Sequence, residues 1–240
     1  MIVEVCANSL ESALNAQKAG ADRIELCAEL GVGGITPSYG LLKSVKEQVT
    51  IPIHVLIRPR SGDFTYDKAE FESMLHDIQL CVDLGFDGIV SGVLEQDLTL
   101  DIKRTEQLKK ASKGLKFTFH RAFDWVKNPF LTMEKLEEIG VDYILTSGQQ
   151  QKALEGIHLL AQLNEQASTC IIMPGSGISA ANVTSFKEKN FKAIHLSGTK
   201  FFPKNANLER LPMSSLHFFQ EDKKIISDPD TLLAVVNRVK

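Results

Sequence analysis

The chain has 240 residues, of which 43% are hydrophobic and 24% are charged. That balance provides enough apolar side chains for a sizeable core and excludes disordered and fibrous proteins. The formal net charge of -3, with no basic run interleaved with aromatics, argues against a nucleic-acid partner. The chain has neither a signal-like N-terminus nor a stretch of about 20 apolar residues, so we expect a cytoplasmic protein with no membrane partner.

Four cysteines, Cys6, Cys27, Cys81 and Cys170, are scattered along the chain without the CxxC spacing of a structural zinc site. A chain of this length needs no disulfide framework, so we expect reduced thiols. Cys81 lies in the apolar stripe of a predicted helix and Cys170 begins a predicted strand, and we expect both to be core residues.

A quasi-repeat predicts the architecture. The segments GADRIELC, GFDGIVSG, GVDYILTS and NFKAIHLS begin at Gly20, Gly85, Gly140 and Asn190, each after an amphipathic helical stretch. A glycine or asparagine at this position can end the helix in the left-handed conformation before a short strand begins. The copies start 50 to 65 residues apart, which is about twice the length of a βα unit, so each interval should hold one further strand.

Those further strands are visible as apolar runs at Ile2–Cys6, Ile51–Ile57, Leu115–His120 and Cys170–Pro174. Eight strands alternating with helices predict an α/β protein, and we interpret residues 1–240 as a single (β/α)8 TIM-type barrel domain. The alternative is an open doubly wound sheet. The absence of GxGxxG after the first strand weakens that alternative.

One connection is long, at about residues 199–228, between the eighth strand and the last helix. Connections of this length are usually functional or interfacial. We interpret its four phenylalanines as a cap on the barrel or a subunit contact, with a surface excursion as the alternative. They are Phe201, Phe202, Phe218 and Phe219.

Polar side chains interrupt the predicted barrel interior. Because strand side chains alternate with period two, Glu4 shares a face with Cys6, and Glu25 shares a face with Cys27. Buried carboxylates are costly unless paired. We expect their partners to be the cationic or hydrogen-bonding groups His54, Arg58 and His120. The alternative is a layer of buried ion pairs without chemistry.

Cys6 and Cys27 end neighbouring strands, where their thiolates can approach one another. Soft thiolate ligands select Cu(I) over hard cations. Two sulfurs suffice for a linear Cu(I) site, with Met173 as a weak third ligand. The alternative is that both cysteines are small buried hydrophobic residues.

An anion site is indicated at the same mouth. Three guanidinium groups, which suit carboxylate or phosphate, come from Arg58, Arg60 and Arg121. Loops after the last two strands of such barrels often bind phosphate, and here they contain Gly175, Ser176, Gly177, Ser197 and Gly198. Glycines that serve the turns alone are the alternative.

Among the histidines, His120 ends the fifth strand beside Arg121, where a neutral imidazole can act as acid or base. His54 and His195 lie inside strands, and we expect them to be satisfied core groups.

The blocks VCANSLESALNAQKAGADRIELCAELGVGGITPSYG, IPIHVLIRPRSGDFTY, FTFHRAFD, ILTSG and MPGSGIS resemble the CutC family. The resemblance runs from the first strand to at least Gly198. It implies a (β/α)-barrel, a cytoplasmic location, a link to copper homeostasis, and a homo-oligomer, for which we expect a dimer. Cysteines have been proposed as Cu(I) ligands in the family's human member, and the resemblance carries that role to Cys6 and Cys27.

Two functions follow from this sequence. The first is copper handling through Cys6 and Cys27. The second is a barrel enzyme acting on a small anionic or phosphorylated metabolite by acid/base chemistry. Its predicted catalytic residues are Glu4, Glu25, Arg58, His120 and Arg121, with Arg60 helping to bind charge. A scaffold without chemistry is the weakest interpretation, because it has no need for ionisable residues at strand ends.

Overall fold

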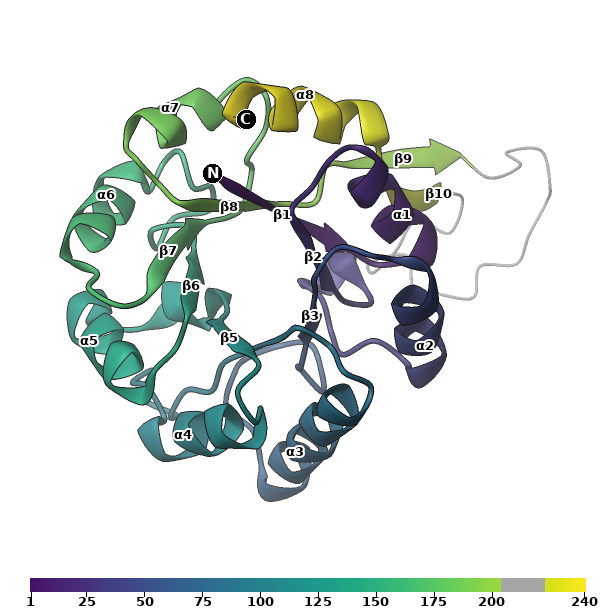
Figure 1. Cartoon of the computed structure of the whole chain (residues 1–240). Helices are drawn as coiled ribbons and strands as arrows, with labels where there is room; N and C mark the ends of the chain where they lie inside the picture. The colour runs from purple at the N-terminus through teal and green to yellow at the C-terminus, as the bar shows by residue number, and fades with distance from the viewer. Residues whose placement is uncertain (204–222) are drawn as a thin grey trace.

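A computed structural model describes residues 1–203 and 223–240. Eight parallel strands alternate with helices in one ring, with the strands inside and the helices outside (Figure 1). The strands are β1 Ile2–Ala7, β2 Arg23–Leu26, β3 Ile53–Leu56, β4 Gly88–Ser91, β5 Lys116–Phe119, β6 Tyr143–Thr146, β7 Ile171–Pro174 and β8 Ala193–Leu196. The helices are α1 Leu10–Lys18, α2 Tyr39–Gln48, α3 Lys68–Asp83, α4 Ile102–Ala111, α5 Pro129–Ile139, α6 Ile157–Gln166, α7 Val183–Glu188 and α8 Pro229–Val239. The predicted (β/α)8 TIM barrel is confirmed.

The sheet runs in the order β7-β6-β5-β4-β3-β2-β1-β8. The first barrel strand, β1, pairs in parallel with the last, β8. β7 and β8 lie next to each other without a ladder among the described strands, so the ring is nearly closed. The closure places Glu4 opposite both Arg23 of β2 and His195 of β8.

The repeat positions end their helices as predicted. Gly20, Gly85, Gly140 and Asn190 have φ values of 83°, 70°, 83° and 57°. All four values lie in the left-handed region, which glycine adopts without cost and asparagine with little cost. The repeated sequence therefore encodes one local event, the reversal from helix to strand, four times around the ring.

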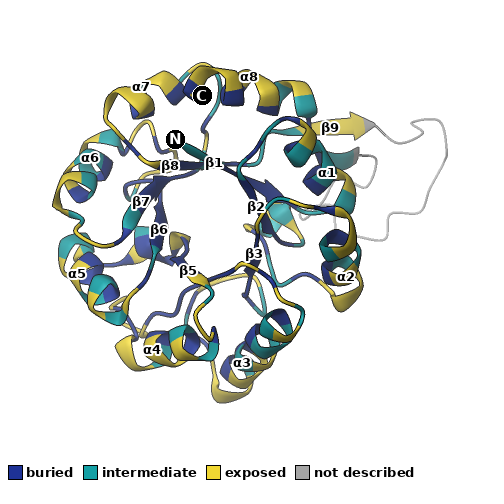
Figure 2. Ribbon diagram, viewed as in Figure 1, coloured by how far each residue is buried: buried dark blue, intermediate teal, exposed yellow. Residues whose placement is uncertain are grey.

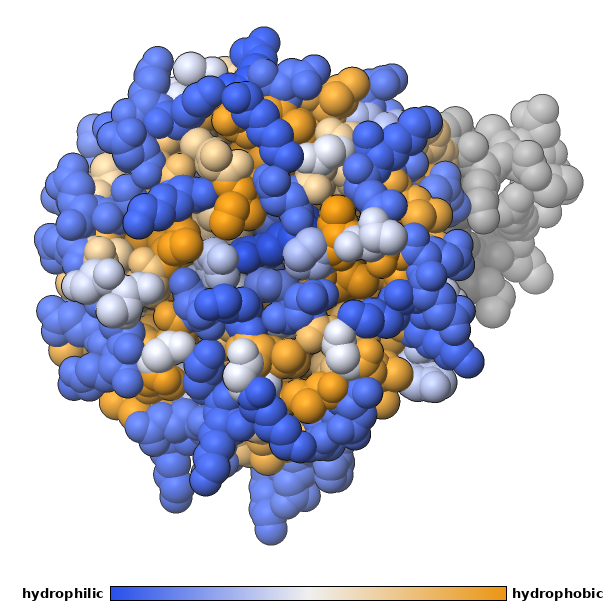
Figure 3. All heavy atoms as spheres, in the orientation of Figure 1, coloured by the Kyte–Doolittle hydropathy of each residue, from blue (hydrophilic) through white to orange (hydrophobic). Residues whose placement is uncertain are grey.

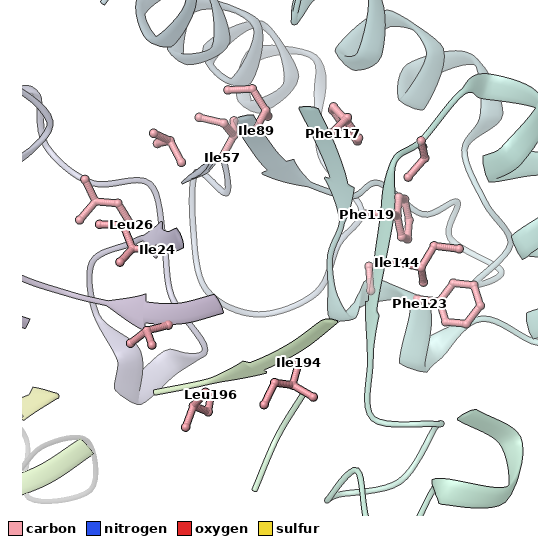
Figure 4. Close-up of a cluster of buried hydrophobic side chains, with 14 of the residues drawn as sticks. Ile24, Leu26, Ile57, Ile89, Phe117, Phe119, Phe123, Ile144, Ile194 and Leu196 are labelled. Carbon is pink, nitrogen blue, oxygen red and sulfur yellow. The ribbon is translucent and has the colours of Figure 1, made fainter. Parts of the chain in front are cut away.

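The main apolar core lies between the strands and the surrounding helices. Val3, Val5, Ile24 and Leu26 belong to it, as period-two alternation predicted. Figure 4 shows members of this layer from several strands, including Phe117, Ile144 and Ile194. In Figure 2 the helices present buried surface to the strands and exposed surface outwards. The alternate residues of the same strands are therefore left to fill the barrel interior.

The long connection begins and ends as a two-stranded antiparallel ribbon, made of β9 Thr199–Pro203 and β10 Lys223–Ser227. Phe201 and Phe202 are exposed on it, whereas Phe218 and Phe219 lie outside the described residues. Among the described helices, none is long and apolar enough to cross a membrane.

We expect Gly88→Ala to destabilise the barrel. A Cβ at position 88 meets the His54 ring at 2.5 Å, inside the packed interior. Overpacking of this kind costs about 1–3 kcal/mol, so the urea midpoint should fall. Gly40→Ala in α2 is the matched control, since its new methyl group has only the Ser38 Oγ, at 4.0 Å. That change should be neutral or stabilise by roughly 0.5–1 kcal/mol. If Gly88→Ala and Gly40→Ala unfold at the same urea midpoint, the close approach of the His54 ring to position 88 is contradicted.

Candidate functional site

A cavity of about 910 Å³ opens at the carboxyl ends of the barrel strands. The opposite end of the ring, where the strands begin, faces the viewer in Figure 3, and there hydrophilic residues occupy the centre as well as much of the outer rim. Apolar side chains, among them Leu56, Phe64 and Trp125, line part of the cavity wall. A cavity of this size suits a small-molecule ligand.

The cavity brings together most of the residues singled out from the sequence. The predicted site residues that line it are Cys6, Glu25, Arg58, His120, Arg121, Ser176, Gly177, Ser197 and Gly198. Four others, Glu4, Cys27, Arg60 and Gly175, are not among its lining residues. His195, which we expected to be a satisfied core residue, does line it.

Below the cavity, Glu4 is fully buried and paired. Arg23 Nε donates to Glu4 Oε2 at 2.5 Å, and His195 Nδ1 lies 2.8 Å from Glu4 Oε1. Burial acts to raise the pKa of Glu4, but the Arg23 charge and the His195 hydrogen bond outweigh it and hold the pKa at about 2. Glu4 is therefore a fixed anion.

The predicted partners of the carboxylates are largely wrong. Arg58 and His120 bond elsewhere, and His54 Nδ1 is 3.9 Å from Glu4 without a hydrogen bond. Arg23 and His195 take the role instead. Arg23 shares a face with Glu25 by period two, which is a local signal that the sequence does contain.

Glu25 lies at the cavity floor with an unusual carboxyl group. Its Oε2 is 3.4 Å from His195 Nδ1 and, among the described atoms, has no hydrogen-bond partner. Burial raises the pKa of Glu25 to about 7, with added repulsion from Glu4, despite the attraction of His195. Burial opposes the charged form of His195, but Glu25, Glu4 and a hydrogen bond with Cys6 raise its pKa well above the usual range. Glu25 and His195 thus form a coupled pair that can hold and move a proton.

The two predicted thiols are in contact. Cys6 Sγ and Cys27 Sγ are 3.4 Å apart, with Cys6 in β1 at the cavity and Cys27, directly after β2, fully buried behind it. The hydrogen bond with Cys27, together with burial, raises the pKa of Cys6 well above its usual value. Met173 lies elsewhere: it accepts a hydrogen bond from Arg23 at 3.5 Å and packs with Leu145.

The arginines of the mouth differ in their hydrogen-bond and ion-pair partners. Arg58 donates to the carbonyls of Val32, Gly34 and Gly62, at 2.7 to 3.0 Å, so its terminal nitrogens hold loops. Arg60 turns outwards and pairs with Glu70 at 2.5 Å.

Arg121 is the guanidinium best placed for a ligand. It donates to Asp124 and Ser147, at 2.8 and 2.9 Å, which fixes its orientation. Its side chain is 43% exposed and lines the cavity. Arg58 also lines the cavity, but it is buried, so among the three predicted anion-binding arginines Arg121 alone combines a fixed position, a place in the cavity lining and an exposed side chain.

His120 is held as a neutral donor. Its Nδ1 accepts a hydrogen bond from the Ala122 N–H at 3.2 Å, which leaves the proton on Nε2. Burial, with the nearby Arg58 charge, lowers its pKa to about 3. Proton transfer by His120 near neutral pH is therefore disfavoured, and its buried Nε2 has no partner among the described atoms.

Comparison with known proteins agrees with the fold and the motifs. The CutC family model matches residues 1–200. The chain belongs to the CutC family. A CutC family protein of Enterobacter sp. (strain 638) is 49% identical over 202 residues, covering 84% of this chain and 82% of the relative. One of Salmonella newport (strain SL254) is 46% identical over the same length, with the same coverage.

Solved structures extend this comparison. A CutC structure from Streptococcus agalactiae, whose name links it to copper homeostasis, is 33% identical with a TM-score of 0.78. It covers 82% of this chain and 98% of its own. A 3-hexulose-6-phosphate synthase of Salmonella typhimurium, at 16% identity and a TM-score of 0.61, covers 100% of this chain and 98% of its own. That likeness shows the barrel fold alone. Of these two structures, only the CutC protein of Streptococcus agalactiae carries a name linked to copper homeostasis.

The raised pKa of Glu25 predicts a pH effect on stability. The folded protein keeps the proton between pH 4.5 and about 7 while the unfolded chain loses it, so this group lowers the free energy of unfolding as pH rises. Glu25→Gln removes the effect. Relative to wild type, its stability should therefore increase with pH across this window, by on the order of 2 kcal/mol.

Urea unfolding at pH 4.5, 5.5 and 7 measures this difference, with the exposed Glu47→Gln on α2 as the control. The control should track wild type at every pH. A constant offset between Glu25→Gln and wild type would show that Glu25 ionises normally in the folded barrel.

Proposed function

We propose that this CutC protein binds Cu(I) through Cys6 and Cys27. The observation that carries the proposal is the 3.4 Å contact between the two sulfurs, one of which reaches the cavity. Thiolates are the ligands that Cu(I) prefers, and the family's link to copper homeostasis points the same way. Such a site needs reduced thiols, as in a cytoplasm.

The sulfur separation favours a bent site. Metal–thiolate bonds of about 2.3 Å, the length seen with zinc, would place two sulfurs about 4.6 Å apart in a straight line. The observed 3.4 Å is shorter, so two such bonds fit an angle better than a line. A bent pair leaves room for a third donor. His195, which has a ligand atom within 4.8 Å of the Cys6 sulfur, takes the place that the sequence suggested for Met173.

We expect the Cys6→Ser/Cys27→Ser variant to lose more than about 100-fold in Cu(I) affinity. Competition with a chromophoric Cu(I) chelator under reducing, anaerobic conditions measures the loss. Because the raised pKa of Cys6 keeps it protonated, binding must release a proton, and wild-type affinity should increase with pH. Cys81→Ser is the control, because Cys81 is a buried core residue of α3. Unchanged affinity in the double variant would refute the proposal.

A second function is favoured by the cavity itself, which is far larger than a metal ion requires. It is acid/base catalysis on a small anionic metabolite. In this function Arg121 binds the anionic group beside the Ser176–Gly177 and Ser197–Gly198 loops, and the Glu25–His195 pair exchanges protons with the substrate.

Inorganic phosphate is the probe for this second function. Phosphate should raise the thermal midpoint of wild type, and Arg121→Gln should abolish most of that increase. Arg60→Gln is the matched control, because Arg60 pairs with Glu70 outside the cavity lining and should leave the increase intact. If phosphate raises the thermal midpoint equally in wild type, Arg121→Gln and Arg60→Gln, then Arg121 does not bind the phosphate.

A further inference from the structure

Cys6, Glu25 and His195 each offer one ligand atom, and these three atoms lie within 4.8 Å of one another. Within residues 1–203 and 223–240 no other group of three such side chains meets this criterion. They come from β1, β2 and β8, three strands that are neighbours in the ring. All three line the cavity. The grouping differs from the cysteine pair, because Cys27 is not a member.

We propose that Cys6, Glu25 and His195 form a site for a divalent transition metal of the zinc type, with its open coordination position facing the cavity. The site goes beyond the Cu(I) proposal, with which it shares only Cys6 and the His195 side chain. Thiolate, imidazole and carboxylate are the three ligand types that zinc takes in proteins. Three protein ligands with one open position are the arrangement of catalytic zinc sites.

The donor set argues against other metals. Magnesium and calcium take oxygen ligands and are poorly served by a sulfur and an imidazole. Cu(I) favours soft donors, for which the Glu25 carboxylate is unsuited. With Cys6 and Glu25 deprotonated, two negative charges would face one divalent cation beside a neutral imidazole, which balances the charge of a buried site.

The surroundings of His195 supply the support that metal-binding histidines need. Glu4 contacts its Nδ1 at 2.8 Å, and Arg23 in turn fixes Glu4 at 2.5 Å. A carboxylate that orients a ligating histidine is the usual outer-shell partner of a metal site. Gly175 leaves space beside the ring, since a Cβ there would lie 3.4 Å from the His195 Cβ and 2.5 Å from Leu145.

A second observation independently indicates a missing partner at this point. Glu25 is buried, and its Oε2 has no hydrogen-bond partner among the described atoms although it faces the cluster. Buried carboxylate oxygens are normally satisfied, so an orphaned one needs an explanation. A bound cation supplies the contact that the protein itself does not.

The test uses the full-length protein, freed of metal by a chelator and kept reduced. Zn²⁺ is titrated against a chromophoric competitor, and Co²⁺ serves as the spectroscopic probe. Glu25→Gln and His195→Gln should each weaken Zn²⁺ binding by more than about 100-fold. The matched controls are Glu47→Gln and His158→Gln, two exposed residues on α2 and α6, and they should bind as wild type.

The cysteines separate this site from the Cu(I) site. Cys27→Ser should lose Cu(I) but keep its Zn²⁺ affinity within about 3-fold, whereas Cys6→Ser should lose both. Co²⁺ bound to wild type and Cys27→Ser should show thiolate-to-metal charge transfer, and Cys6→Ser should not. This readout remains informative even if Glu25→Gln or His195→Gln does not fold.

The outcomes are distinguishable. If Cys27→Ser retains Cu(I) while Zn²⁺ behaves as expected, the copper proposal fails and the divalent site stands. If Zn²⁺ affinity falls in Cys27→Ser as much as in Cys6→Ser, the metal is bound by the cysteine pair and the divalent site is overturned. Absence of Zn²⁺ binding by wild type, or full affinity in folded Glu25→Gln and His195→Gln, overturns it as well.

Discussion

The buried ion pair of Glu4 and Arg23 is the constraint on which the mouth of this barrel depends. A carboxylate with no exposed surface is tolerable only because Arg23 bonds to one oxygen and His195 to the other. Arg23 is fixed in turn by stacking over the Tyr143 ring at 3.9 Å. Removing one member would leave an uncompensated buried charge, at a cost of about 3–5 kcal/mol. The Glu4–Arg23 pair thus stabilises the structure and also supports His195.

That support sets His195 apart from His120, the other histidine that lines the cavity. Both line the same cavity, yet their surroundings push their pKa values in opposite directions. His195 faces two carboxyl groups, whereas His120 faces Arg58 and packs against Phe64. The charged imidazole of His195 and the neutral imidazole of His120 therefore lie at one cavity. Their neighbours determine which form each histidine takes. His195 lies where our proposals place proton exchange and a metal ligand, and His120 is restricted to donating a hydrogen bond.

The barrel could be predicted from sequence because its signals are local. Gly20, Gly85, Gly140 and Asn190 recur in one context, and their left-handed conformations confirm the repeat. The proximity of Cys6 to Cys27 follows from period two on adjacent strands. The Glu4–His195 contact spans 191 residues and depends on ring closure between β1 and β8, so no local pattern indicates it. Likewise, the outward turn of Arg60 depends on where α3 places Glu70, which the sequence of the turn does not specify.

Cys6 is the residue at which the possible chemistries of this CutC protein converge. It touches Cys27 on one side, and on the other its sulfur lies within 4.8 Å of ligand atoms of His195 and Glu25. A soft monovalent ion would favour the sulfur side, and a borderline divalent ion the mixed side, so ligand softness selects between two overlapping donor sets. Because Cys27 is fully buried and Cys6 lines the cavity, any ion arriving from solvent meets Cys6 first. Under the two proposals, the choice between copper and a divalent metal would therefore be made by the second ligand, and Cys27 and Glu25 are the residues that would distinguish the two.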